Sequence, residues 1–163
     1  MMKHNGPLKT LGPQAAQLVT SLHEDNKLVF RLEDVQRILS LEEPTTRSLV
    51  RTLVNRGVAA RLKPGLFILV PFELGREREY LGNPFIVARE LAGGKDYFLS
   101  HGTAMSIHGM VTQPQLVVHV TMTAPRRPVR IMGTEFRFFA FAKDGFFGLM
   151  DHWVTKQEKV RIS

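Results

Sequence analysis

Five cationic side chains and no acidic one lie between Pro44 and Pro71. They are Arg47, Arg51, Arg56, Arg61 and Lys63. Guanidinium and ammonium groups bind phosphate oxygens, and a guanidinium can also read the edge of a guanine. The whole sequence has the same bias, because 22 Lys and Arg residues outnumber 15 Asp and Glu residues and give a formal net charge of +7. The stretch therefore predicts a surface for a polyanion, with nucleic acid as the first choice.

The first four turns of this stretch have the periodicity of an amphipathic helix. On a helical wheel that starts at residue 45, Leu49, Val50, Leu53 and Val54 fall on one side and predict a core face. The opposite side carries hydrogen-bond donors suited to phosphates and base edges. We therefore predict DNA binding by the residues Thr45, Thr46, Arg47, Ser48, Arg51, Thr52, Asn55 and Arg56.

A serine and two histidines further along the chain are candidates for catalytic or metal-binding groups. Ser100 precedes His101, but sequence neighbours at a helix start point in different directions, so we interpret Ser100 as an N-cap. His101 and His108 are seven residues apart on one predicted helix face, without a third ligand at a metal-binding spacing. We expect one nitrogen of His108 to bond to the backbone, and we predict no metal site and no cofactor.

A nuclease is a further alternative, because the chain is basic. Asp151, Gln157 and Lys159 loosely imitate the acidic and lysine motifs of metal-dependent nucleases, but the spacing is short and a second carboxylate is not evident. We predict no catalytic residue and no enzymatic activity.

The elements around the cationic stretch follow a known order. Helical periodicity from Pro13 to Leu22, a strand in "KLVF", and helical periodicity in "RLEDVQRILSL" precede the helix ending at Gly57. "VAARL" and "LFILV" then form two strands around the turn "KPG". This order is that of a winged helix-turn-helix, in which the third helix enters the major groove and the hairpin, with Arg61 and Lys63, contacts the flanking backbone. The rival interpretation is a protein-interaction module that docks on an acidic partner.

A second domain follows a change in composition after residue 71. We place domains at residues 1–75 and 76–163, with net charges of +3 and +4 by count. The second domain is predicted to hold two helices and then several strands, so the fold class is α+β with a mixed α/β second domain and an antiparallel-rich sheet. Its segment "PRRPVR" places Arg126, Arg127 and Arg130 in a loop that could follow a phosphate backbone.

The sequence contains no cysteine, no signal-like N-terminus and no apolar run of the roughly 18 residues that a membrane span needs. We therefore expect a soluble cytoplasmic protein without membrane contacts.

Several segments together resemble a known family. "GVAARLKPGLFILV", "YFLSHGTAMSIHGM", "GTEFRFFAFAKDGFFG" and "KVRIS" are similar to segments of the AbiEi antitoxins of type IV abortive-infection toxin-antitoxin systems and related transcriptional regulators. The resemblance covers most of residues 13–163. Its most specific part is the helix with Ser100, His101, Ala104, His108 and Gly109.

The resemblance implies a cytoplasmic prokaryotic repressor that binds repeats in its own promoter, as a monomer or homodimer. It also implies functional opposition to a nucleotidyltransferase-like toxin without a required stable complex. Family members continue past a "VRIS"-like strand, whereas this sequence stops at Ser163. The resemblance therefore predicts a fragment of a longer protein or a shortened relative. If neutralisation of the toxin needs the part beyond Ser163, this chain is expected to bind DNA without neutralising the toxin.

Overall fold

The computed structural model describes residues 11–71 and 82–163. The chain divides into two compact units, Met1–Tyr80 and Leu81–Ser163. The described residues form five α-helices and two sheets whose strand pairs are mostly antiparallel, so the fold class is α+β. The domain boundary predicted between residues 75 and 76 lies outside the described residues.

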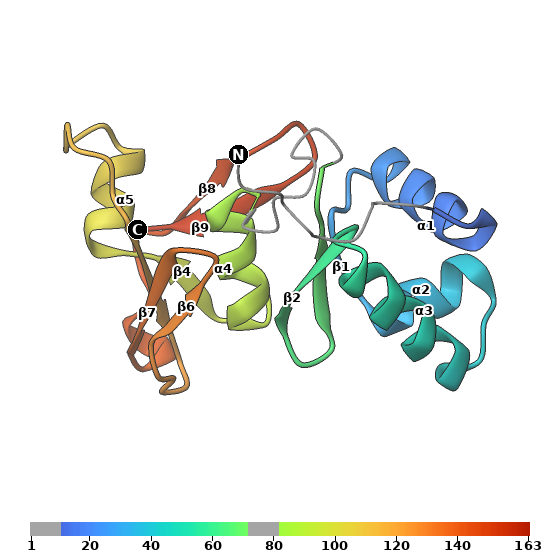
Figure 1. The fold of residues 1–163 in the computed structure, drawn as a ribbon. Coiled ribbons are helices and arrows are strands. Elements are labelled where there is room, and N and C mark those ends of the chain that lie inside the picture. The colour runs from blue at the N-terminus through green and yellow to red at the C-terminus, as the bar shows by residue number, and fades with distance from the viewer. Residues whose placement is uncertain (1–10, 72–81) are drawn as a thin grey trace. The chain divides into compact units, whose positions relative to one another are not determined.

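The first unit alternates helices with the strands of a small sheet. Its elements are α1 (Pro13–Glu24), β1 (Val29–Arg31), α2 (Leu32–Leu39), α3 (Glu43–Asn55), β2 (Ala59–Lys63) and β3 (Leu66–Leu69). The sheet order is β1-β3-β2 with both pairs antiparallel. Figure 1 shows α2 and α3 side by side, with the β2–β3 hairpin next to α3. The predicted sequence of helices and strands is confirmed, although α3 begins at Glu43 rather than at residue 45.

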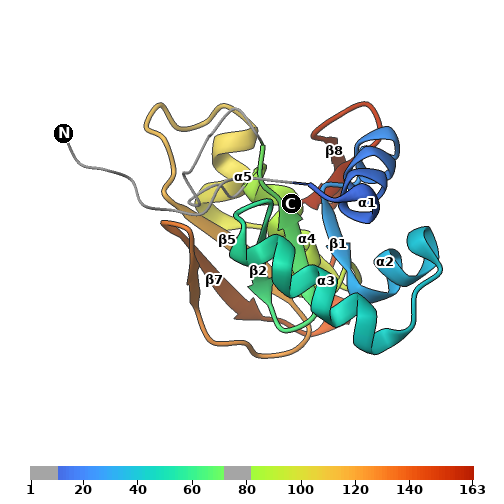
Figure 2. The ribbon, with the colours of Figure 1, turned by 45° about the vertical axis from the view of Figure 1, so that its right-hand side comes forward.

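In the core of this unit, the apolar sides of all three helices pack against the sheet. Leu18 of α1, Val35 of α2 and Leu53 of α3 are at most 1% exposed. On the sheet side, the rings of Phe30 and Phe67 stack at 5.7 Å between centroids. Burial of an apolar side chain of this size contributes about 1.5–3 kcal/mol, so these residues hold α1, α2 and α3 against their sheet (Figure 2).

Two glycines set the path from α3 into the hairpin. Gly57 follows the C-cap of α3 with a φ of 72°, and Gly65 in the hairpin turn has a φ of 77°. Both angles lie in the left-handed region, where a side chain is costly. The predicted helix stop and the predicted turn are therefore confirmed, and they fix where the hairpin lies relative to α3.

The second unit is a mixed six-stranded sheet with two helices. The helices are α4 (Pro84–Ala92) and α5 (His101–Ile107), and Lys143–Gly145 form a short 3₁₀ helix, η2. The strands are β4 (Tyr97–Leu99), β5 (Val117–Met122), β6 (Val129–Ile131), β7 (Thr134–Ala140), β8 (Met150–Trp153) and β9 (Lys159–Ile162). Their order is β6-β7-β5-β4-β9-β8, with β5–β7 and β4–β9 parallel.

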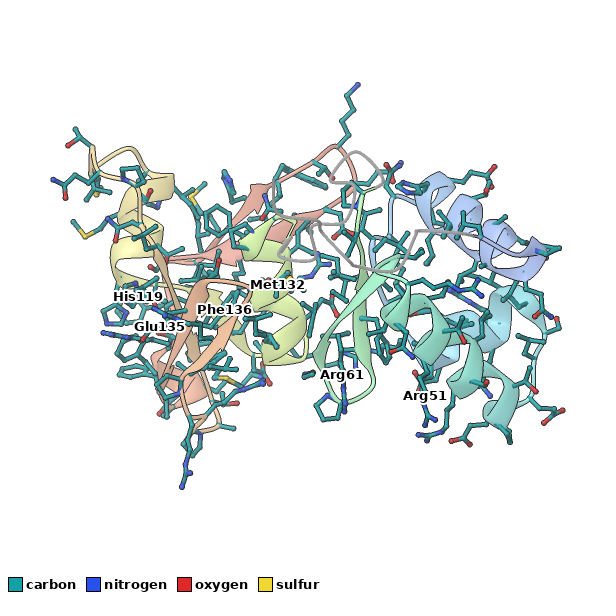
Figure 3. The ribbon with its side chains drawn as sticks, viewed as in Figure 1. Arg51, Arg61, His119, Met132, Glu135 and Phe136 are labelled. Carbon is teal, nitrogen blue, oxygen red and sulfur yellow. The ribbon has the colours of Figure 1, made fainter. Side chains whose placement is uncertain are left out.

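The two faces of this sheet differ. Val120 of β5, Phe136 of β7 and Leu99 of β4 are fully buried and lie on the face that α4 covers with Val87 and Leu91. Because side chains alternate along a strand, the neighbours of these residues point to the other face. In Figure 3, His119 and Glu135 lie on the side of the sheet away from Phe136.

None of the helices formed by the described residues combines the length and the apolar character that a membrane-spanning segment requires.

Candidate nucleic-acid interface

A hollow of about 280 Å³ lies between α3 and the β2–β3 hairpin of the first unit. Its lining residues are Leu32, Arg47, Val50, Arg51, Val54, Asn55, Arg61, Gly65 and Phe67. Three guanidinium groups from two elements therefore surround an apolar floor. Figure 3 labels Arg51 on α3 and Arg61 on β2, whose side chains extend from the same side of the unit. The structure thus brings together four of the predicted residues: Arg47, Arg51, Asn55 and Arg61.

Arg51 and Arg61 have no acidic partner among residues 11–71 and 82–163. Both are exposed, and neither makes a side-chain hydrogen bond or salt bridge with the residues that the structure describes. An unpaired guanidinium keeps its five donors available and loses no existing interaction when it binds an anion. We therefore expect Arg51 and Arg61 to be the main cationic ligands for an anion in this hollow.

Arg47 differs, and the expectation that no acid lies near it is wrong. Its Nε and Nη2 donate to Glu43 Oε1, at 2.8 Å and 2.5 Å. Glu43 precedes the acid-free stretch in sequence, but it occupies the first turn of α3 and so lies one helical turn from Arg47. Pro44 in that first turn is typical of a helix start, and this signal could have placed Glu43 inside the helix.

Thr46 does not belong to the exposed face and is removed from the predicted DNA-binding set. Its side chain is fully buried, and its Oγ1 donates to the carbonyl oxygen of Glu42 at 3.0 Å. It precedes Val50 by four residues and Leu53 by seven, so it continues the core stripe toward the start of α3. The neighbouring Thr45 and Ser48 are exposed, as predicted.

The remaining predicted residues of α3 lie elsewhere on the unit. Thr52 and Arg56 line a separate hollow of about 370 Å³ together with the start of α1. Thr52 is half-buried, and its Oγ1 donates to the carbonyl oxygen of Ser48 at 3.1 Å. The face predicted as one surface is therefore divided between two hollows. In the hairpin, Lys63 closes β2 and is half-buried, whereas Arg61 is exposed.

The segment with Arg126, Arg127 and Arg130 is only partly the predicted loop. Arg126 is half-buried, donates to the carbonyl oxygen of Leu91, and lies 4.9 Å from the ring centre of Phe138. Burial lowers the pKa of its guanidinium. Arg126 therefore holds α4 to the sheet and is not a free phosphate ligand. Arg130 lies in β6 opposite Glu135, and Arg127 stays exposed in the loop.

The start of α5 differs from its prediction. Ser100 occupies the N-cap position, but its side chain makes no capping hydrogen bond. Its hydroxyl instead accepts from Thr121 Oγ1 at 2.8 Å and lies 2.9 Å from His101 Nδ1. The side chains of Ser100 and His101 meet because His101 adopts a left-handed backbone with a φ of 49°. Ser100 is 3% exposed, which keeps its hydroxyl from acting as a nucleophile toward a bulky substrate.

The histidines do not group as their sequence spacing suggested. His101 lies against His119 at 5.9 Å between ring centres, and His108 lies beyond the last residue of α5. The predicted backbone bond of His108 is confirmed, because its Nε2 is 2.8 Å from the carbonyl oxygen of Ser163. Burial lowers the pKa of His119, and the charges of His101 and Arg137 lower it further.

No group of three or more His, Asp or Glu residues within residues 11–71 and 82–163 is placed to hold a metal ion. The carboxylate considered for a nuclease, Asp151, forms a salt bridge with Lys159 at 2.6 Å. The hydrogen bond from Lys159 lowers the pKa of Asp151.

This chain resembles a protein of known structure in its fold. No protein-family model matches the chain, and no curated protein matches it. The chain is similar to the crystal structure of the RV2827C protein from Mycobacterium tuberculosis, with 17% identity and a TM-score of 0.60. The match covers 89% of this chain and 51% of that chain, so this chain spans about half the length of its structural neighbour. The likeness concerns the arrangement of helices and strands alone.

Proposed function

We propose that residues 13–71 form a winged helix-turn-helix that binds double-stranded DNA. In this proposal α3 enters the major groove, and the β2–β3 hairpin contacts the flanking backbone. The observation that carries the proposal is the hollow in which Arg47 and Arg51 of α3 meet Arg61 of the hairpin. A phosphate or a guanine edge is the ligand that several guanidinium groups around one hollow suit best.

On this basis we propose that the chain is a DNA-binding transcriptional regulator of the AbiEi type. It would repress its own promoter in the cytoplasm, bind there as a monomer or homodimer, and oppose a nucleotidyltransferase-like toxin. The support for this finer assignment is the resemblance of four sequence segments, among them the helix from Ser100 to Gly109. Its role is binding rather than catalysis.

The salt dependence of duplex binding tests the proposal. Each phosphate contact releases counterions, so the logarithm of the binding constant falls with the logarithm of salt concentration by about 0.9 per contact. Arg61→Ala should make this slope shallower by about one unit on every duplex. Lys95→Ala, which changes the charge equally at an exposed residue of the other unit, should leave the slope unchanged. Absence of salt-dependent duplex binding would favour the protein-interaction alternative.

The salt bridge between Glu43 and Arg47 predicts a variant with increased DNA affinity. Glu43→Gln should release Arg47 for DNA and remove a negative charge from the first turn of α3. An exposed pair at this spacing is worth about 0.3–0.5 kcal/mol, so we expect tighter duplex binding by about twofold, measured by fluorescence anisotropy at low salt.

Glu42→Gln is the matched control for this prediction. It removes the same charge from the neighbouring residue, which is the N-cap of α3 and makes no salt bridge with Arg47. Equal gains for both variants would mean that net charge alone acts, and that the pairing of Arg47 has no effect on binding.

A further inference from the structure

The six-stranded sheet of the second unit has one face that α4 does not cover. Along β7, Phe136 and Phe138 point to the α4 side, where Phe138 contacts Arg126, so Arg137 and Phe139 point to the opposite face. The strand register extends this assignment across the sheet, because Phe139 pairs with Thr121 and Thr121 pairs with Phe98. The middle of this side is covered, because Thr121 is 5% exposed and the ring of Phe146 packs edge-on against that of Phe98 at 4.9 Å between centres. We call this side of the sheet the open face.

The same alternation extends the open face to β9 and β8. Val160 and Ile162 of β9 are 1% exposed and belong to the buried side, which places Arg161 on the open face. Asp151 pairs with Arg161, and Trp153 pairs with Lys159, so these residues share that face. Neighbouring strands are about 4.8 Å apart. Four strand spacings therefore place Phe139 on β7 about 20 Å from Trp153 on β8, with the part covered by Phe146 between them.

Aromatic rings are exposed at both ends of this face. Phe139 is 37% exposed and Trp153 is 59% exposed. The ring of His101 lies 4.2 Å from that of Phe139 at an angle of 31°, which holds Phe139 in place. Lys159 Nζ lies 5.4 Å from the ring centre of Trp153. Exposed rings are unfavourable in water, so a sheet face that keeps two of them has the character of a binding surface.

The charged groups beside these rings are mainly cationic. Arg137 donates its Nε to Glu135, but its side chain is 53% exposed and has further donors to offer. Arg161 is exposed beside the salt bridge of Asp151 and Lys159. Exposed rings beside guanidinium groups on a sheet can stack unpaired bases and bind their phosphates. A duplex hides the faces of its bases and cannot use such rings.

We propose that the open face of the second unit binds single-stranded nucleic acid. Bases stack on Phe139 and Trp153, and phosphates lie against Arg137 and Arg161. This site uses none of the residues of the duplex-binding hollow in the first unit. The two binding proposals can therefore be tested independently.

The fluorescence of Trp153 tests the proposal directly, because it is the only tryptophan of the sequence. The full chain is titrated with oligothymidylate and oligouridylate of about 12 nucleotides. Saturable quenching by either oligonucleotide is the expected result, and the ratio of the two affinities distinguishes DNA from RNA. Absence of quenching by both would overturn the proposal and favour a protein partner for this face.

Substitutions then locate the site. Phe139→Ala should weaken binding about 5- to 150-fold, as expected when one stacked base is lost. Phe139→Leu keeps an apolar side chain and the fold, and should weaken binding as well, because it removes the ring. Leu116→Ala, which shortens an 81% exposed side chain next to β5, should have no effect. Equal losses for Phe139→Leu and Leu116→Ala would contradict the assignment.

A double variant separates this site from the first unit. Arg51→Ala with Arg61→Ala removes two of the three cations of the duplex-binding hollow and should leave the quenching of Trp153 unchanged. Loss of single-strand binding in this variant would place that activity in the first unit and overturn the proposal for the open face.

Discussion

Arg51→Ala is expected to weaken binding to the specific duplex by about 1–3 kcal/mol and binding to random duplex by much less. Arg51 extends from the middle of α3 into the hollow that faces the hairpin, and no acid pairs with it among the described residues. Its guanidinium is therefore available to bind a base edge through two parallel hydrogen bonds. The specific duplex is selected from a random pool with the unmodified chain, and both affinities are measured at one fixed salt concentration.

Arg56→Ala is the control for this prediction. Arg56 is the C-cap residue of α3, and it lines the hollow next to α1 rather than the hollow next to the hairpin. We expect its effect to be smaller and equal on both duplexes. A larger effect for Arg56 than for Arg51 would mean that the other side of α3 meets DNA. Equal losses for Arg51→Ala on both duplexes would make Arg51 a phosphate ligand only.

The helices and strands of the first unit could be predicted from local patterns. Apolar residues at helical spacing located α1, α2 and α3, and the glycines at 57 and 65 marked a helix end and a turn. These signals are local because each depends on side chains within one or two turns of the backbone. The side of α3 on which each residue lies was predicted less well, because the helical wheel began at residue 45 and omitted the first turn. Glu43 was therefore not placed on the helix beside Arg47, and Thr46 was wrongly placed on the exposed face.

The second unit shows what local patterns cannot provide. The sequence assigns no site to His119, Phe139 or Trp153, because local patterns do not say which strands are neighbours. Their common face depends on the strand order β6-β7-β5-β4-β9-β8, which joins residues far apart in the chain. The contact of Ser100 with His101 was missed for a different reason. A left-handed φ at a residue other than glycine is uncommon, and nothing in the local sequence indicated it.

Phe30→Ala is expected to destabilise the first unit by about 3–5 kcal/mol. Phe30 is fully buried, and its ring stacks on Phe67 between the sheet and the helices. A domain of about 60 residues has a small core and is marginally stable, so a loss of this size removes most of its stability. Amide hydrogen exchange should then show loss of protection in α1, α2 and α3, together with loss of duplex binding.

The second unit should keep its protection in the same variant, because its core around Phe136 belongs to a separate compact unit. Phe136→Ala provides the matched substitution: Phe136 is also fully buried, and its removal should expose β5 and β7 while α3 stays protected and duplex binding persists. The comparison distinguishes two independent folding units from one cooperative fold. If either substitution removes protection from both units to the same extent, the units unfold together and the chain is one cooperative fold.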